Sequence, residues 1–200
     1  MRLCVISLGT ILAAAVAFPQ ELARGVQLYG ERKYTDAEKE LRATVKAEPE
    51  NARGHYYLGL TLLELKKPAE AEGALSQADS LSSTAETKVA LARALLEQRK
   101  FEQAEEQIRA AESRDATYAG ILYERGRLHL AKQEYSNAVD DLAKFSEREP
   151  EDAYGHYYLA MAYNGAGRKD MALKHFDRFL RLRPDAPEAK RVRTLVQGVR

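Results

Sequence analysis

A repeat of about 34 residues most narrowly limits what this chain of 200 residues can fold into. Residues 55–59 read His-Tyr-Tyr-Leu-Gly and recur at 156–160 as His-Tyr-Tyr-Leu-Ala, an offset of 156 − 55 = 101, or three repeats less one residue. Two columns of small residues recur at the same spacing. One holds Gly25, Gly59, Ala92, Gly126 and Ala160, and the other holds Ala37, Ala71, Ala104, Ala138 and Ala172. Such a period indicates a stack of similar supersecondary units.

Residues 153–185 show the repeating unit most clearly. Leu159, Ala160 and Tyr163 place a large, a small and an aromatic residue on one helix, which Gly167 interrupts. Apolar residues resume beyond the glycine at helical spacing until Pro184, which cannot continue a helix. The unit is therefore expected to be a helix–turn–helix.

These residues resemble the tetratricopeptide repeat (TPR) family, whose helix–turn–helix repeat is about 34 residues long. The resemblance implies an all-α fold, a right-handed α-solenoid of about five repeats plus a C-terminal capping helix. The repeat domain is expected at 18–186, with repeats at about 18–51, 52–84, 85–118, 119–152 and 153–186. Residues 187–200 carry valine and leucine at three- and four-residue spacing and are expected to cap repeat five.

Several residues are expected to begin the second helix of a repeat. Thr35 reads as an N-cap because Glu38, three residues later, completes a capping-box pattern. Ser136 and Asp170 are expected to cap the corresponding helices of repeats four and five. Pro68 is expected in the first turn, where its missing N–H costs nothing.

The first 17 residues differ from the rest of the chain. Arg2 precedes an uncharged, mostly apolar run that ends in Ala-Val-Ala, which predicts a signal peptide at 1–17 with cleavage before Phe18. The protein is then exported, either periplasmic or secreted. An uncleaved N-terminal anchor with membrane association is the alternative. Cys4 lies too early in the chain to be a lipoprotein cysteine. Because it is the one cysteine of the chain, no internal disulfide is expected.

Charge is unevenly distributed along the chain. Residues 168–200 contain ten Lys or Arg against four Asp or Glu, a net charge of +6. The whole chain is +1 and Arg2 supplies one charge, so residues 18–167 carry 1 − 1 − 6 = −6. A solvated helix face explains the basic end most simply, with an acidic partner or anionic lipid headgroups as alternatives. The acidic balance of the preceding part argues against binding to nucleic acid.

No catalytic or cofactor-binding pattern stands out. The sequence has no Gly-rich phosphate loop, nucleophile elbow or zinc-binding helix, so neither an enzyme nor a cofactor or metal is expected. His55 and His156 hold equivalent repeat positions and are interpreted as scaffold residues. Two adjacent acidic pairs, at 105–106 and 140–141, diverge by about 100° on a helix and are expected to face solvent.

The family resemblance implies a concave groove lined by the first helices. Carried onto this chain, the residues expected to bind a peptide or protein there are Tyr56, Leu60, Arg93, Tyr123, Arg127, Tyr157, Met161 and Asn164. Tyrosine with arginine is typical of recognition surfaces. Tyrosines that merely fill an unoccupied groove are the alternative. Glu97 and Glu124 lie near enough along the helices to neutralise Arg93 and Arg127 internally.

The preferred interpretation is a non-catalytic scaffold of the cell envelope that binds another protein or peptide through the concave groove. The alternative is a membrane-anchored structural subunit of an envelope complex, with the N-terminal segment uncleaved. The oligomeric state and the identity of the partner do not follow from the sequence.

Overall fold

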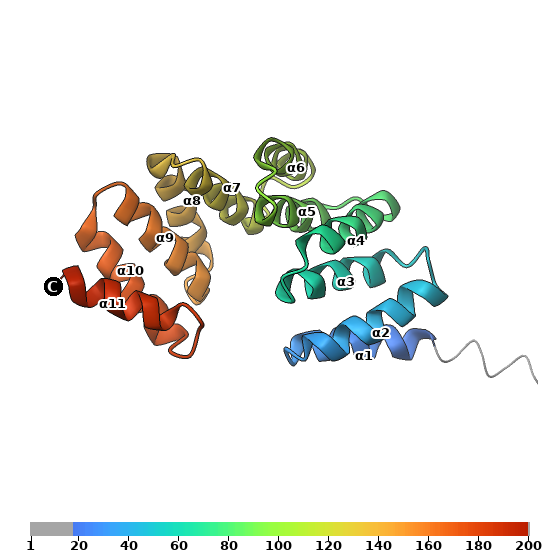
Figure 1. The fold of residues 1–200 in the computed structure, drawn as a ribbon. Helices are drawn as coiled ribbons and strands as arrows, with labels where there is room; N and C mark the ends of the chain where they lie inside the picture. The colour runs from blue at the N-terminus through green and yellow to red at the C-terminus, as the bar shows by residue number, and fades with distance from the viewer. Residues whose placement is uncertain (1–17, 200) are drawn as a thin grey trace, which may run out of the picture. The chain divides into compact units, whose positions relative to one another are not determined.

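The computed structural model describes residues 18–199, and the side chains of residues 22–197 within them. Over this range the chain forms eleven helices and no strand, which confirms the predicted all-α class (Figure 1). The helices are α1 (Phe18–Gly30), α2 (Tyr34–Ala47), α3 (Ala52–Glu64), α4 (Pro68–Leu81), α5 (Ala85–Glu97), α6 (Phe101–Arg114), α7 (Ala119–Ala131), α8 (Tyr135–Arg148), α9 (Ala153–Gly165), α10 (Lys169–Leu182) and α11 (Ala189–Val199). The predicted signal peptide, 1–17, lies outside the described residues.

The described residues divide into two compact units, one ending at Gln98 and the other beginning at Arg99. In the first unit α1 packs on α2 and α3 on α4, and α5 covers α4. In the second unit α7 packs on α8 and α9 on α10, with α6 against α7 and α11 against α10. Successive hairpins also touch through their first helices, α1 with α3 and α7 with α9. Each unit is therefore a stack of helix hairpins, as the repeat predicts.

The turn within each hairpin uses a left-handed residue at the same repeat position. The five residues are Arg32, Lys66, Arg99, Gln133 and Gly167, with φ between 60° and 76°. In four of these turns the next N–H donates to a carbonyl five residues back, at 2.8 to 2.9 Å: Lys33 to Leu28, Lys67 to Leu62, Glu134 to His129 and Arg168 to Tyr163. This Schellman geometry ends the first helix and satisfies its last carbonyl groups.

The second helix begins directly after the left-handed turn, which is earlier than the predicted N-cap residues imply. The helices α2, α8 and α10 have Lys33, Glu134 and Arg168 at the N-cap, and none of these side chains caps its helix. The expectation that Thr35, Ser136 and Asp170 are N-caps is therefore wrong.

Glu38 was expected to complete a capping box with Thr35. Its carboxylate instead accepts hydrogen bonds from Arg42 and Lys67. Pro68 does stand in the first turn of α4, as predicted.

Side-chain caps occur instead on first helices. Asn51 and Asp152 accept hydrogen bonds from the N–H groups of Gly54 and Gly155, at 2.8 and 2.6 Å. Thr84 and Thr87 form a reciprocal capping box at the start of α5. These caps satisfy helix donors that would otherwise lack a partner.

The two small-residue columns lie inside the stack, as the repeat predicts. The alanine column is fully buried, with side chains at 0% exposure in four copies and Ala172 at 3%. In the other column a Cβ on Gly25 or Gly126 would come within 2.7 or 2.5 Å of a leucine sixteen residues later. At these two positions glycine allows the two helices of a hairpin to cross at close range.

The core of the second unit continues into α11. Phe176 and Phe179 of α10 are buried in one apolar cluster with Val192 and Val196 of α11. The expected amphipathic tail is thus a helix whose apolar side faces α10. Leu195 departs from this pattern, because its side chain is 43% exposed.

Candidate binding surface

In the first unit, an arginine of the predicted groove set is held by a carboxylate on a neighbouring first helix. The Arg93 Nη2 atom of α5 donates to Glu64 Oε1 of α3 at 2.8 Å. Glu64 lies 29 residues earlier in the chain and is not among the predicted groove residues. Arg93 therefore stands among first-helix residues, as expected, but its charge is already balanced within the unit.

The tyrosines of the first unit form an aromatic cluster. The ring of Tyr56 lies 5.5 Å from that of Tyr57, and Tyr57 lies 5.8 Å from Tyr29 of α1. Burial raises the pKa of the Tyr29 phenol, so Tyr29 remains neutral at ordinary pH. Tyr56 and Leu60 are half-buried, and each leaves part of its side chain accessible to a partner.

In the second unit, Arg127 lies over two tyrosine rings. Its Cζ atom is 5.0 Å from the centre of the Tyr158 ring and 5.8 Å from that of Tyr123. The two rings meet edge to face at 5.7 Å, and Tyr123 also packs on Phe145. Burial raises the pKa of the Tyr123 phenol well above its ordinary value, so it does not ionise near neutral pH.

Arg127 is also neutralised, as the sequence analysis allowed. Its Nη1 atom donates to Glu124 Oε2 at 2.8 Å, and the two side chains are only 12% and 4% exposed. The guanidinium is thus fixed by a carboxylate on one side and by ring faces on the other. It serves as a rigid, polar edge to an aromatic surface.

The structure places Tyr157 inside the unit. Its side chain is 9% exposed and its ring lies 5.2 Å from Phe179 of α10. Tyr158, which the sequence analysis passed over, is half-buried beside Arg127. Helical spacing could have indicated that Tyr158 lies on this surface, since Tyr154, Tyr158 and Met161 recur at intervals of four and three.

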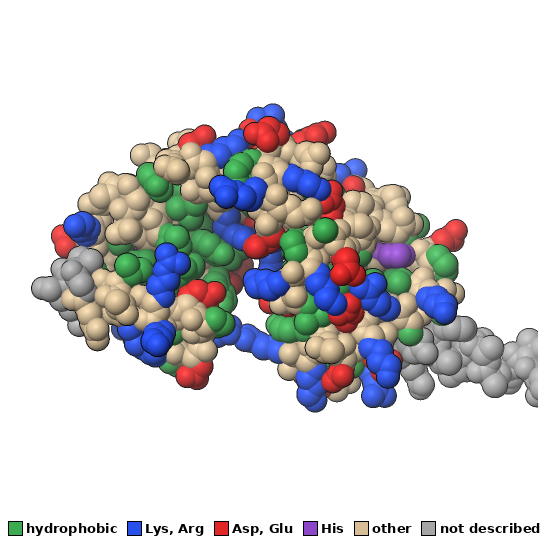
Figure 2. Space-filling model, in the orientation of Figure 1, with side chains coloured by type: hydrophobic (Ala, Val, Ile, Leu, Met, Phe, Trp, Pro, Cys, Tyr) green, Lys and Arg blue, Asp and Glu red, His purple; other side chains and the backbone are tan. Residues whose placement is uncertain are grey.

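The remaining predicted residues lie along α9. Met161 is half-buried and Asn164 is exposed. Hydrophobic side chains gather over α9 in the view of Figure 2, which agrees with the half-buried Tyr158 and Met161 packed against the unit's core. Tyr123 and Arg127 of α7 lie beside Tyr158 of α9, and we call the surface formed by these three residues and Met161 of α9 the "α9 surface".

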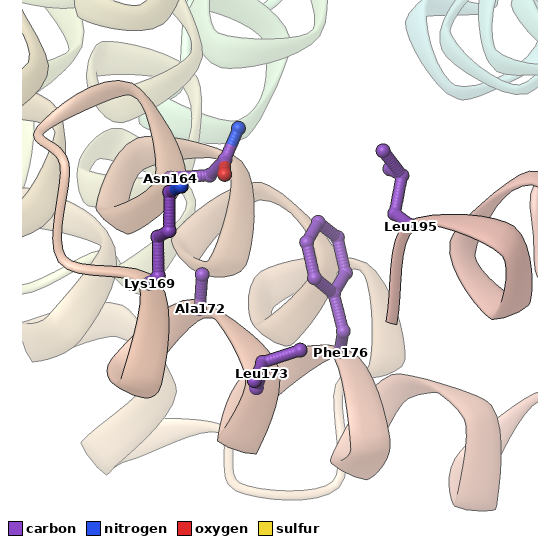
Figure 3. Close-up of a pocket in the computed structure, with 6 residues that line it drawn as sticks. All are labelled: Asn164, Lys169, Ala172, Leu173, Phe176 and Leu195. Atoms are coloured by element: carbon purple, nitrogen blue, oxygen red, sulfur yellow. The ribbon is translucent and has the colours of Figure 1, made fainter. Parts of the chain in front are cut away.

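Asn164 lines a separate hollow near the end of α9. The other lining residues are Lys169, Ala172, Leu173, Phe176 and Leu195 (Figure 3). Leu195 comes from α11 and the other four from α10, so the hollow lies within the second unit.

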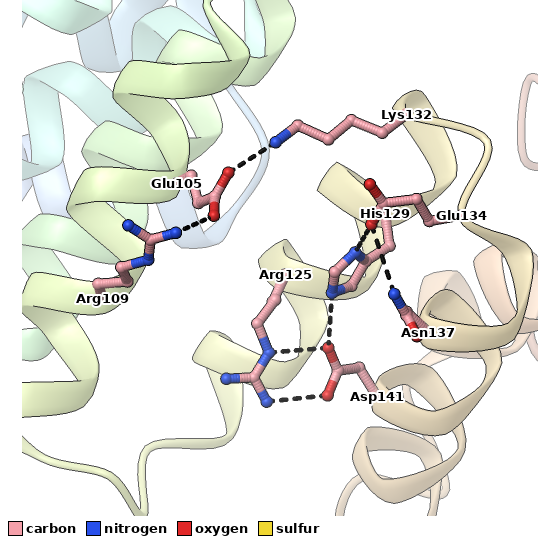
Figure 4. Close-up of polar contacts among 8 residues, drawn as sticks. All are labelled: Glu105, Arg109, Arg125, His129, Lys132, Glu134, Asn137 and Asp141. Atoms are coloured by element: carbon pink, nitrogen blue, oxygen red, sulfur yellow. Dashed lines mark hydrogen bonds and ion pairs between the residues drawn. The ribbon is translucent and has the colours of Figure 1, made fainter.

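A polar network joins α6, α7 and α8 (Figure 4). Arg125 donates two parallel hydrogen bonds to Asp141, both at 2.8 Å, and the Asp141 side chain raises the pKa of the guanidinium. Asp141 is 6% exposed, so the expectation that it faces solvent is wrong. Glu105, also expected to face solvent, accepts hydrogen bonds from Lys132 and Arg109. The long cationic side chains reach across helices, which adjacent spacing along one helix does not reveal.

His129 lies between two carboxylates of this network. Its Nδ1 atom lies 2.6 Å from Glu134 Oε2, and its Nε2 atom lies 3.6 Å from Asp141 Oδ2. Both ring nitrogens thus face acidic side chains of α8 or of the turn before it. The network is better explained as a link between helices.

The other histidines behave as scaffold residues. The Nε2 atoms of His55 and His156 contact the carbonyl oxygens of Pro49 and Pro150, at 2.9 and 3.0 Å. This shared contact agrees with their equivalent repeat positions. In the described part of the chain, no three or more His, Cys, Asp or Glu residues are placed to hold a metal ion.

A tetratricopeptide repeat profile matches residues 22–86, 89–145 and 123–187, most of the described chain. The chain belongs to the tetratricopeptide repeat family. Among curated proteins, none matches it.

Solved structures share the TPR fold with this protein. A thermophilic TPR protein in Thermus thermophilus has a TM-score of 0.76 at 22% identity, over 90% of this chain and 97% of that one. A MamA protein has a TM-score of 0.59 at 22% identity, over 86% and 94% of the two chains. YrrB, described as a TPR protein with an unusual peptide-binding site, has a TM-score of 0.56 at 15% identity, over 87% and 90%. At these identities the likeness concerns the fold.

TPR membership explains why the packing residues were easy to recognise and the surface residues were not. The residues that define a repeat, such as Gly126 and Ala138, face the neighbouring helix. The exposed positions differ from one hairpin of this chain to the next. None of the helices within 18–199 has both the length and the apolar character that crossing a membrane requires.

Proposed function

We propose that this TPR protein is a non-catalytic scaffold that binds a partner protein or peptide through first-helix surfaces, chiefly the α9 surface. The observation that carries the proposal is the placement of Arg127 against Tyr123 and Tyr158. Tyrosine and arginine supply much of the binding energy at protein interfaces, because large rings bury area at little cost in entropy.

The two arginines of these surfaces are already paired with carboxylates of this chain. We therefore expect the partner to bind mainly through apolar and aromatic contacts, and less through a carboxylate of its own. Arg127 already pairs with Glu124, and Arg93 with Glu64. A partner side chain would pack against Tyr158 and Met161 and accept a hydrogen bond at the edge of the guanidinium. The first-unit residues Tyr56 and Leu60 offer a second half-buried surface of similar chemistry.

Site-specific photocrosslinking tests this assignment with the full chain in its native cells. A photoreactive phenylalanine analogue replaces Met161 in one variant and Arg109, which is exposed on α6, in the control variant. We expect one partner to be crosslinked from position 161 and not from position 109. The reverse pattern would place binding on second helices and overturn the assignment.

Substitution provides the second arm of the test. Tyr158→Ala combined with Met161→Ala removes apolar area while leaving the Arg127–Glu124 pair in place. We expect the partner identified by crosslinking to bind at least about tenfold more weakly. Leu81→Ala, at an exposed leucine of the first unit, is the matched control. A fold check by thermal melting accompanies each variant.

We further propose that the scaffold acts in the cell envelope, either periplasmic or secreted, after removal of residues 1–17. The support is the sequence pattern of that segment, with Arg2 before an apolar run and Ala-Val-Ala at its end. Mass spectrometry of the protein purified from its native cells tests this. A mature N-terminus at Phe18 is the expected result, and an intact Met1 terminus at the membrane supports the anchored alternative.

A further inference from the structure

An exposed leucine on α11 marks a second surface of the second unit. Val192 and Val196 are buried against α10, yet Leu195 between them is 43% exposed. In the described residues, the one other large hydrophobic side chain with comparable exposure is Leu81 of the first unit, at 36%. Leu195 is therefore an apolar side chain that the packing of α11 leaves largely uncovered.

Leu195 faces Phe176 across the hollow that Asn164 also lines (Figure 3). Leu173 and Ala172 complete its apolar wall, on the same side of α10 as Phe176. The hollow encloses only about 20 Å³. Sites for small molecules usually enclose about 300–1,000 Å³, so this hollow is a shallow apolar surface against which a partner side chain can pack.

The surroundings of the hollow are basic. Lys169 lines it, and Arg191 lies on α11 one turn before Leu195. Both side chains are exposed, and neither has an ion-pair partner among the described residues. By contrast, Lys132 and Arg125 of the same unit are paired with Glu105 and Asp141. Lys169 and Arg191 thus form no ion pair among the described residues, and their charges are open to solvent.

The net charge of the C-terminal part of the chain also favours an acidic partner. Residues 168–200 carry ten Lys or Arg and four Asp or Glu, a net charge of +6, against −6 for residues 18–167. A positive field attracts acidic partners and raises their association rate. An apolar hollow with unpaired cations at its edge is complementary to an acidic segment that carries one large apolar side chain.

We propose that this hollow and its basic edge form a docking site for an acidic amphipathic segment of a partner protein. The segment packs a leucine or phenylalanine side chain against the exposed Leu195 at the mouth of the hollow. Its carboxylates lie against Lys169 and Arg191. The contacts of this site are made by α10 and α11, with Asn164 of α9 at its border, and they include none of Tyr123, Arg127, Tyr158 and Met161, so the two proposals can be tested separately.

Fluorescence anisotropy with the full chain tests the proposal. The probe is a labelled synthetic amphipathic peptide with leucine on one helical face and glutamate on the other. Two control peptides replace every glutamate with lysine or every leucine with serine. We expect the protein to bind the first peptide alone, and the affinity to fall as salt is raised. Equal binding of all three peptides would overturn the proposal.

Protein variants then locate the site. Leu195→Ser, at a largely exposed position, is expected to weaken peptide binding about tenfold or more. The double reversal Lys169→Glu with Arg191→Glu is expected to weaken it as strongly without touching the apolar wall. Matched controls are Leu81→Ser and Lys46→Glu, both on exposed residues of the first unit. Unchanged affinity in Leu195→Ser, with the fold intact by thermal melting, would overturn the proposal.

Two other occupants are distinguished in the same experiments. In one arm, vesicles that contain phosphatidylglycerol replace the peptide. If substitution of Leu195, Lys169 and Arg191 weakens vesicle binding more than it weakens peptide binding, the occupant is a lipid surface and not a protein. Analytical ultracentrifugation compares the wild type with Leu195→Ser. Self-association that this substitution abolishes would assign the hollow to a second copy of the chain. Either result overturns the proposal of an acidic protein segment.

Discussion

Gly126 of α7 packs so closely on Leu142 of α8 that a Cβ atom on Gly126 would lie 2.5 Å from the Leu142 Cγ atom. Gly59 stands in the same relationship to Leu75, and Gly25 to Leu41. The separation is sixteen residues in each hairpin. The same crossing of two helices is therefore built from the same pair of positions in both units.

This relationship predicts that Gly126→Ala is destabilising. The added methyl group collides with Leu142, and overpacking of a well-packed core typically costs about 1–3 kcal/mol. Gly73→Ala in α4 is the matched control, because a Cβ there meets nothing within 4 Å and alanine favours a helix by up to about 1 kcal/mol. Urea denaturation of the three proteins measures both effects. Similar midpoints for the two variants would contradict the close crossing.

Ala138→Leu is expected to be destabilising for a related reason. The Ala138 side chain is fully buried in a column that is alanine in every repeat, so leucine must displace its neighbours. The expected cost is again about 1–3 kcal/mol. Ala69→Leu, at an exposed position of α4, should change the melting midpoint little. A melting midpoint of Ala138→Leu equal to that of the wild type would place this residue outside the stack.

The buried carboxylate of Asp141 should matter more than its position on a helix suggests. Asp141→Ala leaves Arg125 without its bidentate partner, and we expect a loss of about 1–3 kcal/mol, reduced because Arg125 retains some contact with water. Replacing both residues, as Arg125→Met with Asp141→Leu, should recover much of that loss. Denaturant unfolding of Arg125→Met, Asp141→Leu and the double variant forms a double-mutant cycle. A coupling energy near zero would show that the pair does not link α7 to α8.

Thermal melts of two threonine variants test the reassigned helix caps. Thr84→Ala removes the hydroxyl that accepts from the Thr87 N–H at 3.2 Å, and loss of an N-cap costs about 1 kcal/mol. Thr35→Ala changes a residue inside the first turn of α2, so the expected effect is within about 0.5 kcal/mol. A larger effect at Thr35 would restore the capping role that the sequence predicted.

Acid should weaken the second unit through His175. Burial lowers the pKa of His175 to about 4, and the His156 ring and the charge of Lys174 act in the same direction. An unfolded histidine takes up its proton near pH 6.5. Between pH 6.5 and about 4 the unfolded state therefore binds more protons, and the free energy of unfolding falls as pH falls.

Because His175 is only half-buried, the loss is expected to be about 1–2 kcal/mol. His175→Gln, which retains a donor for the His156 Nδ1 atom, should show a shallower dependence over this pH range. Denaturation curves at several pH values measure the slopes. An NMR titration that gives His175 an ordinary pKa would contradict the prediction.

The sequence by itself determined the helix hairpin and its packing residues. Small residues at Gly126 and Ala138 recur at the repeat spacing because each hairpin makes the same crossing, and a crossing tolerates few side chains. Apolar periodicity likewise predicted α11, since a helix that covers another must place apolar residues every three or four positions. The division of the chain into repeats remains a prediction.

Only the tertiary structure decided how the polar and aromatic side chains are used. Arg93 is balanced by Glu64, and Arg125 by Asp141, through contacts between helices far apart in sequence. The turn residue Lys66 adopts a positive φ although it is not glycine, because the Schellman bonds of the hairpin hold it there. Tyr157 and Tyr158 are adjacent and chemically identical, yet one is buried and the other lies beside Arg127, because neighbouring residues on a helix diverge by about 100° and only the packed hairpin decides which direction is the core.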